Sequence, residues 1–191
     1  PGRIVLQVLD LADSDAERGP VIQLLSLVEA DWPDGLSVTS LDRVSRLAGV
    51  VGGWEAWDGQ LRLWADERER LAQSGENGLS PAAARREADL ARAAASFISE
   101  FLPDVQRLAN RHSWEDLARH LSGFLRRHVP AREVDRPEVL EMVEQLADLD
   151  ATGVAPSLTK ASRLLHKQLS DRSRRDERYQ ESRVSFGSIM R

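Results

Sequence analysis

The stretch GVVGGWEAWDGQLRLW, residues 49–64, places glycines and tryptophans close together, and it could serve either chemistry or packing. A phosphate-binding P-loop needs a lysine followed by Ser or Thr after its glycines, and this stretch contains no lysine. Trp54, Trp57 and Trp64 are instead spaced as one face of a helix. We therefore predict a corner between two helices that is pinned by packed tryptophans. The alternative is a platform on which nucleotide bases stack.

Other residue types that carry chemistry do not combine into a catalytic motif. The chain has no cysteine, which excludes disulfides, thiolate metal sites and cysteine nucleophiles. His112, His120 and His128 are eight residues apart, so each is rotated by about 80° from the last on a helix and they cannot converge on one ion. We interpret them as ordinary surface or cap-region histidines. The sequence predicts no catalytic residue and no cofactor, and it leaves open whether the chain is part of an enzyme.

Charge is distributed unevenly along the chain. The net charge is −5, so the molecule as a whole is not a polycation that seeks nucleic acid. Residues 133–150 hold seven acids against one arginine, whereas residues 160–191 hold nine bases against four acids. A second basic region lies between residues 107 and 132.

These two basic regions supply the candidate DNA contacts. If they share a face, that face could bind phosphates with low affinity and without sequence preference. The alternative is that they dock onto acidic neighbours in the same parent protein. The candidate residues are Arg107, Arg111, Arg126, Arg127, Arg132, Arg172, Arg174, Arg175 and Arg178.

The elements that must position these residues are expected to be mainly α-helices, arranged as a multi-helix, bundle-like domain over residues 1–181. Apolar residues recur at helical spacing in most segments, although residues 4–9, IVLQVL, also alternate as a short strand would. Thr39 or Ser40 is expected to cap one helix, and Ser80 another with Pro81 in its first turn. A long alanine-rich helix follows, and we expect Pro103 to break or kink it.

The last stretch, ESRVSFGSIMR, changes character and predicts a short C-terminal strand or hairpin arm over residues 182–191. A single strand cannot satisfy its own backbone groups. We therefore expect it to lead into a missing neighbouring motor domain, in a chain of which this is one piece. No signal peptide and no apolar run of about 20 residues is present, so we expect a cytoplasmic protein without a membrane partner.

Several pieces in this order resemble one family. They are GRIVLQVLDLADSD, DRVSRLAGVVGG, SWEDLARHLSGFLRRHV and the closing RVSFGSIMR. Together they resemble the central helical, accessory (2B-like) region of bacterial PD-(D/E)XK nuclease family and superfamily I helicase-like proteins of the AddB/RecB/RecC kind. The resemblance covers nearly the whole chain and depends on pattern rather than on a catalytic motif.

The resemblance implies a non-catalytic piece of an ATP-dependent helicase/exonuclease that processes DNA double-strand breaks. Its partners would be DNA and the neighbouring motor and nuclease domains of a parent chain. The family's Walker A lysine, nuclease carboxylates and iron–sulfur cysteines have no matching positions here, so no catalytic residue is carried over. Two alternatives remain: a stand-alone helical protein-interaction or scaffold module, and an enzyme of unknown type.

Overall fold

The computed structural model describes residues 1–28, 30, 32–74 and 80–187, and the side chains of all of these except 173 and 175–187. Within this part of the chain the fold is helical throughout and contains no strand, which confirms the mainly α prediction. The elements are α1 (Gly2–Asp13), α2 (Arg18–Leu25), α3 (Val38–Leu47), α4 (Ala56–Ser74), α5 (Pro81–Ala109), α6 (Trp114–His128), α7 (Arg136–Glu144), the 3₁₀ helix η2 (Gln145–Thr152) and α8 (Leu158–Gly187).

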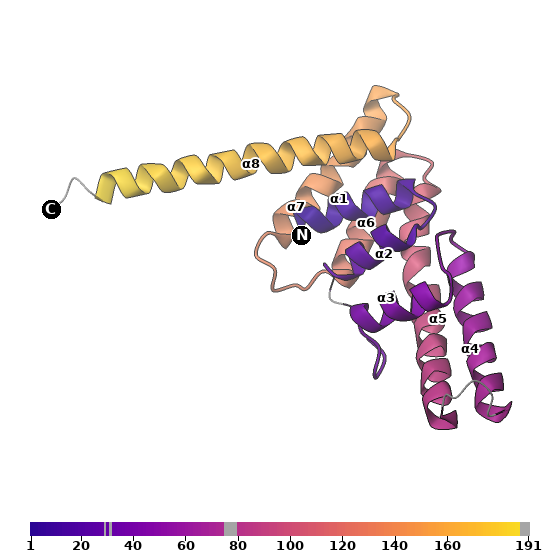
Figure 1. Cartoon of the computed structure of the whole chain (residues 1–191). Helices are drawn as coiled ribbons and strands as arrows, with labels where there is room; N and C mark the ends of the chain where they lie inside the picture. Colours follow the sequence, from indigo (N-terminus) through magenta and orange to yellow (C-terminus); the bar gives the residue numbers. More distant parts are fainter. Residues whose placement is uncertain (29, 31, 75–79, 188–191) are drawn as a thin grey trace.

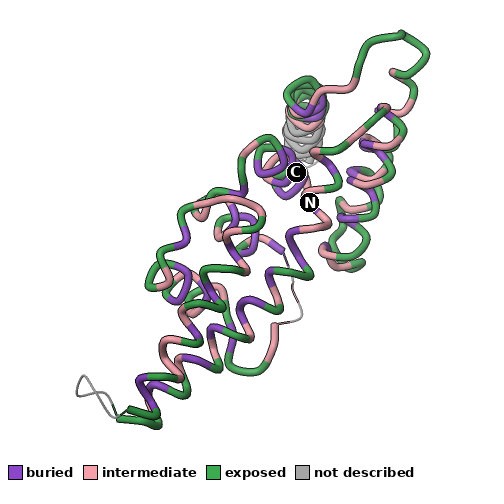
Figure 2. Tube along the Cα trace, turned by 90° about the vertical axis from the view of Figure 1, so that its right-hand side faces the viewer, coloured by how far each residue is buried: buried purple, intermediate pink, exposed green. Residues whose placement is uncertain are grey.

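One hydrophobic core joins these helices, because each presents an apolar stripe to its neighbours. Figure 2 shows buried and exposed residues alternating along each helix at about the period of one turn. Residues 3–12 form a helix rather than a strand, with Val5, Val8 and Leu11 fully buried. Helix α1 packs against α2, α5 and α8, so it lies at the centre of the molecule.

The start of α3 differs from the prediction. Ser37 is the N-cap residue, and Ser40 is the third helical residue that completes a reciprocal capping box. The Ser37 hydroxyl accepts from the Ser40 backbone N–H, and the Ser40 hydroxyl accepts from the Ser37 backbone N–H. Sequence reasoning missed Ser37 because several Ser and Thr residues are adjacent there, and each is an acceptable cap by type.

The stretch of glycines and tryptophans is a corner, as predicted. The backbone N–H of Gly53 donates to the carbonyl of Asp15, and the Trp57 indole donates to the carbonyl of Ala16 at 2.8 Å. A Cβ on Gly52 would lie 3.2 Å from the backbone of Glu17, so only glycine fits this approach without displacement. The corner therefore fastens the start of α4 onto the turn between α1 and α2.

Helices α4 and α5 form a long antiparallel hairpin, visible at the lower right of Figure 1. Ser80 caps α5 and Pro81 occupies its first turn, as predicted. Pro103 does not end the helix, which continues to Ala109. Buried residues on both sides of Pro103, among them Phe101 and Val105, hold the helix against the core and offset the missing backbone hydrogen bond.

Helix α6 is positioned by its own cap and by the acidic segment that follows it. The Ser113 hydroxyl accepts from the backbone N–H of Asp116. The Asp150 carboxylate, in η2, accepts from the backbone N–H groups of Trp114 and Glu115 at 2.9 and 3.0 Å. A carboxylate at this end satisfies free N–H groups and interacts favourably with the helix dipole.

Helix α8 leaves the rest of the molecule and extends away from it (Figure 1). Its first turns pack on α1 and α7 through Leu158, Ala161 and Leu165. The backbone is helical as far as Gly187, so residues 182–187 differ from the predicted strand, and residues 188–191 lie outside the described part. Residues 170–183 contain good helix formers and no Gly or Pro, so they allow the preceding helix to continue. Among the described residues, no helix combines the length and apolar character needed to cross a membrane.

Candidate nucleic-acid interface

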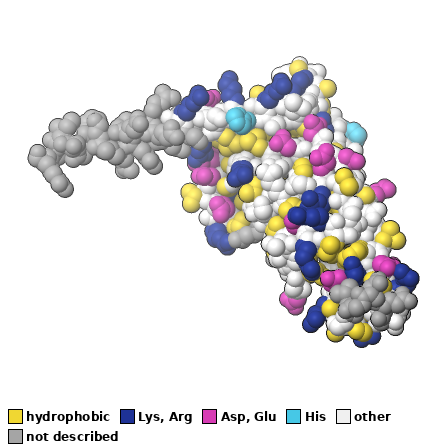
Figure 3. All heavy atoms as spheres, in the orientation of Figure 1, with side chains coloured by type: hydrophobic (Ala, Val, Ile, Leu, Met, Phe, Trp, Pro, Cys, Tyr) yellow, Lys and Arg dark blue, Asp and Glu magenta, His cyan; other side chains and the backbone are white. Residues whose placement is uncertain are grey.

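The nine predicted basic residues are distributed over three helices and two connections. Arg107 lies on α5, Arg126 and Arg127 on α6, and Arg172 and Arg174 on α8, with Arg111 and Arg132 in connections. Arg175 and Arg178 belong to α8, and their side chains lie outside the described part. Figure 3 shows basic and acidic side chains interspersed over the face in view. The two basic regions thus lie on different elements, the first on α5, on α6 and in the connections that follow them, and the second on α8.

Two of the predicted residues meet at a single carboxylate between α5 and α6. Arg107 donates to Oδ1 of Asp104 at 2.6 Å, and Arg127 donates to Oδ2 of the same residue. Nε2 of His128 lies 3.2 Å from Oδ2. We call Asp104, Arg107, Arg127 and His128 the Asp104 cluster. One acid there faces two arginines and one histidine, so positive charge is in excess.

Burial and charge act on both titratable groups of the Asp104 cluster. Burial lowers the pKa of His128, and the hydrogen bond to Asp104 offsets that effect only in part. The ring packs edge-on against Phe101 and beside Phe124, which accounts for its burial. Burial alone would raise the pKa of Asp104, but hydrogen bonds from His128 and Arg127 outweigh it and lower that pKa. Both lowered pKa values are consistent with a neutral His128 that donates its Nε2–H to an ionised Asp104.

Sequence reasoning missed Asp104 and took His128 for an ordinary surface or cap-region residue. The spacing from Asp104 to Arg107 is a helical i,i+3 pair that the sequence could have indicated. The contacts with Arg127 and His128 join residues more than 20 positions apart on two helices. No local pattern identifies such a pair, because it depends on how α5 packs on α6.

Most other predicted residues have partners inside the chain. Arg126 donates to Glu144 at 2.6 Å, across from α6 to α7. Arg111 donates to the backbone carbonyls of Leu108 and Ala109, at the end of α5. Arg132 and Arg174 also take part in interactions within the chain. Of these contacts, the pair of Arg126 with Glu144 matches the alternative in which basic residues dock onto acidic neighbours, with the acid supplied by this chain itself.

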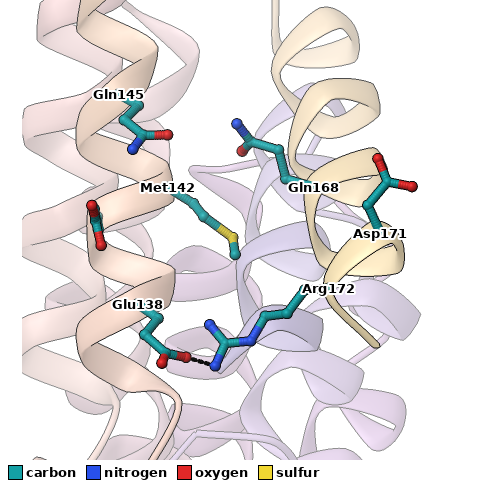
Figure 4. A pocket seen from close by; sticks show the side chains of 7 residues that line it. Glu138, Met142, Gln145, Gln168, Asp171 and Arg172 are labelled. Atoms are coloured by element: carbon teal, nitrogen blue, oxygen red, sulfur yellow. Dashed lines mark ion pairs between the residues drawn. The ribbon is translucent and has the colours of Figure 1, made fainter. Parts of the chain in front are cut away.

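A polar groove of about 610 Å³ lies between α7 and α8 (Figure 4). Arg172 of α8 pairs with Glu138 of α7 across it, and Met142 points into the space between the two helices. Gln145 and Gln168 line the groove farther along, again from opposite sides. The acidic segment and the basic segment thus face each other here and neutralise part of each other's charge.

The described residues include no group of three or more His, Asp or Glu side chains placed to hold a metal ion. The Asp104 cluster has a histidine and a carboxylate but no hydroxyl or thiol beside them to act as a nucleophile. Its arginines can bind oxyanions. In comparisons with protein-family models, curated proteins and solved structures, nothing matched this chain.

Proposed function

We propose that this chain is a non-catalytic helical accessory domain that contacts DNA phosphates, as part of a helicase–nuclease that processes DNA double-strand breaks. The contact surface is the side of α5 and α6 that carries the Asp104 cluster. Binding there is weak, independent of base sequence and sensitive to salt, because arginines that meet phosphates release counterions. The motor and nuclease activities belong to other parts of the proposed machine.

The observation that supports this proposal is the excess of cations around Asp104. Both oxygens of its carboxylate already accept hydrogen bonds, from Arg107 on one side and from Arg127 and His128 on the other. Each guanidinium has five N–H donors and uses only part of that number on the carboxylate. Arg107 and Arg127 are 58% and 64% exposed, so their remaining donors are open to a partner. The helicase–nuclease setting comes from the sequence resemblance alone.

Salt dependence of DNA binding tests this surface. A fluorescently labelled 20-base-pair duplex is titrated with the full chain at several salt concentrations, and the slope of log K against log salt is measured. The double variant Arg107→Gln/Arg127→Gln should make the slope shallower by about 1.8, because each lost phosphate contact contributes about 0.9.

The matched control is Arg62→Gln/Arg70→Gln, which removes the same charge from α4. Both control arginines are exposed, and each pairs with an acid one turn away, Asp58 and Glu67 respectively. The control should leave the slope within experimental error of the parent. Equal slopes in the parent and in the Arg107/Arg127 variant would refute the assignment of this surface.

A second candidate function is a stand-alone protein-interaction or scaffold module, and helix α8 favours it. The helix extends to Gly187 beyond the part that packs on α1 and α7 (Figure 1). Isolated helices of this kind are marginal in water, so a partner that packs on α8 would stabilise it. Light scattering coupled to gel filtration, together with the DNA titration, distinguishes the scaffold function from the DNA-binding function. A defined oligomer together with no DNA binding in dilute salt supports the scaffold and contradicts the DNA proposal.

A further inference from the structure

A small cavity lies next to the Asp104 cluster, between α5 and α6. Its volume is about 120 Å³, and its lining combines three arginines with one acid. A space of this size holds several waters, so the cavity has room for a phosphate group. The lining residues are Asp104, Arg107, Arg119, His120, Gly123, Phe124 and Arg127.

The spacing on α6 produces this arrangement. Arg119, Gly123 and Arg127 are four residues apart and share one face, so each arginine stands about 6 Å along the axis from the glycine. A Cβ on Gly123 would meet no atom within 4 Å, so the glycine leaves a gap between the two arginines. Arg107 lines the cavity from α5. The three guanidinium groups therefore surround a gap on two helices.

The charges that face the cavity favour an anion. Asp104 is the acid in the lining, and its oxygens are occupied by Arg107, Arg127 and His128. Arg119 is held in place by Glu115 and Asp116, which pair with its two terminal nitrogens from outside the cavity. Guanidinium groups recognise phosphate oxygens through paired N–H donors, which makes three of them around one gap suited to a tetrahedral oxyanion.

From these contacts we infer that the cavity between α5 and α6 is a binding site for a single phosphate group, held by Arg107, Arg119 and Arg127. The inference deepens the proposed function and rests on it for one source of that group, the DNA backbone. The other source is free phosphate or a phosphomonoester. The chemistry that both sources share is a tetrahedral phosphate group with at least two unesterified oxygens, which carry one negative charge in a backbone diester and up to about two in a monoester or in free phosphate.

Inorganic phosphate is the probe for the first experiment, in calorimetric titrations of the full chain at constant ionic strength. Saturable binding is expected. Gly123→Leu fills the gap and Arg119→Gln removes one donor group, so each should weaken binding by tenfold or more. Asp104→Asn removes the carboxylate from the lining and should tighten binding.

Gly59→Leu is the matched control, because Gly59 also lies exposed within a helix and a Cβ there would meet no atom within 4 Å. Both leucine variants should melt no lower than the parent, since leucine is a better helix former than glycine. Binding by the control should stay within twofold of the parent. Absence of saturable binding by the parent, or equal affinity of the parent, Gly123→Leu and Arg119→Gln chains, would overturn the inference.

Competition with the labelled duplex separates the two sources of the phosphate group. If phosphate displaces DNA at constant ionic strength, and Gly123→Leu weakens both ligands, the site takes a backbone phosphate. If phosphate binds without displacing DNA, and Gly123→Leu weakens the binding of phosphate but not the binding of DNA, the site stands as one for free phosphate or a phosphomonoester. The proposed DNA surface is then judged by its own salt slope, so the two proposals can fail separately.

Discussion

The cleft between α5 and α6 and the groove between α7 and α8 both join arginines to acids, but they do so in opposite ways. In the Asp104 cluster one carboxylate, 10% exposed, faces three groups that are or can become cations. In the groove, Arg172 and Glu138 form a one-to-one pair and are 30% and 47% exposed. In the first region the cations outnumber the acid that they share. The lining of the groove instead holds three acids, Glu138, Glu141 and Asp171, against Arg172, so its charge is acidic and is partly screened by solvent.

This difference shows that charge counted along the sequence does not by itself locate a cationic surface. The strongest contrast in the sequence lies between residues 133–150 and 160–191, yet these segments meet across the groove and partly cancel. The cleft between α5 and α6 carries fewer charges, but its cations gather around the single carboxylate of Asp104. A candidate interface for phosphates therefore depends on which charges share partners, and less on how many there are.

The largest expected effect comes from removing the shared carboxylate. Asp104→Asn leaves Arg107, Arg127 and His128 without their counter-charge in a partly buried place, and should lower the free energy of unfolding by about 2 kcal/mol. Urea unfolding measures it. Glu138→Gln in the groove is the matched control and should cost under about 1 kcal/mol. Equal losses of unfolding free energy in Asp104→Asn and Glu138→Gln would mean that the shared carboxylate contributes no more to stability than the exposed one in the groove.

The acidic segment also serves α6 directly, which makes Asp150 the next test. Asp150→Ala removes the acceptor for the N–H groups of Trp114 and Glu115 and should cost about 1–2 kcal/mol of stability. Asp148→Ala, an exposed acid two residues earlier on the same element, is the control and should change stability little. A similar cost for both would mean that Asp150 acts through general charge and not as a cap.

The stability of the Asp104 cluster should depend on pH in a defined direction. Since burial lowers the pKa of His128 in the folded chain, the unfolded chain binds a proton more readily, and stability falls as pH drops below the unfolded value of about 6.5. The slope for this one proton is at most about 1.4 kcal/mol per pH unit. The His128→Gln variant should show a smaller change of the urea midpoint between pH 7 and pH 5 than the parent. The control variant His166→Gln, on α8, should show the same change as the parent.

The smallest effect is expected for the exposed pairs, and double-mutant cycles measure it. The cycle of Arg126 with Glu144 should give a coupling of about 0.2–1 kcal/mol, because both side chains are more than half exposed. The cycle of Arg127 with Asp104 should give more, since its carboxylate is buried. A larger coupling for Arg126 with Glu144 than for Arg127 with Asp104 would contradict the stronger electrostatic interaction expected in the Asp104 cluster.

Much of the fold follows from local patterns, and the errors have identifiable causes. The stripes on α1 and α6 predicted buried faces that the structure confirms. The capping residue of α3 was misjudged because neighbouring serines compete as caps. Of the break or kink expected at Pro103, the break does not occur, because tertiary packing sustains α5. For the candidate site, the arginines were predicted by type and the pairing around Asp104 was not, since it joins α5 to α6.

The sequence by itself determined that the chain is helical and bears no recognisable catalytic motif. These properties depend on residue type and on spacing within one turn or a few turns, where propensity and hydrophobic period act. The tertiary structure decided which arginines are neutralised, that His128 is packed between Phe101 and Phe124, and that Gly123 leaves a gap between Arg119 and Arg127. Such features arise from the packing of helices that are distant in the chain, because electrostatic interactions depend on separation and burial in space.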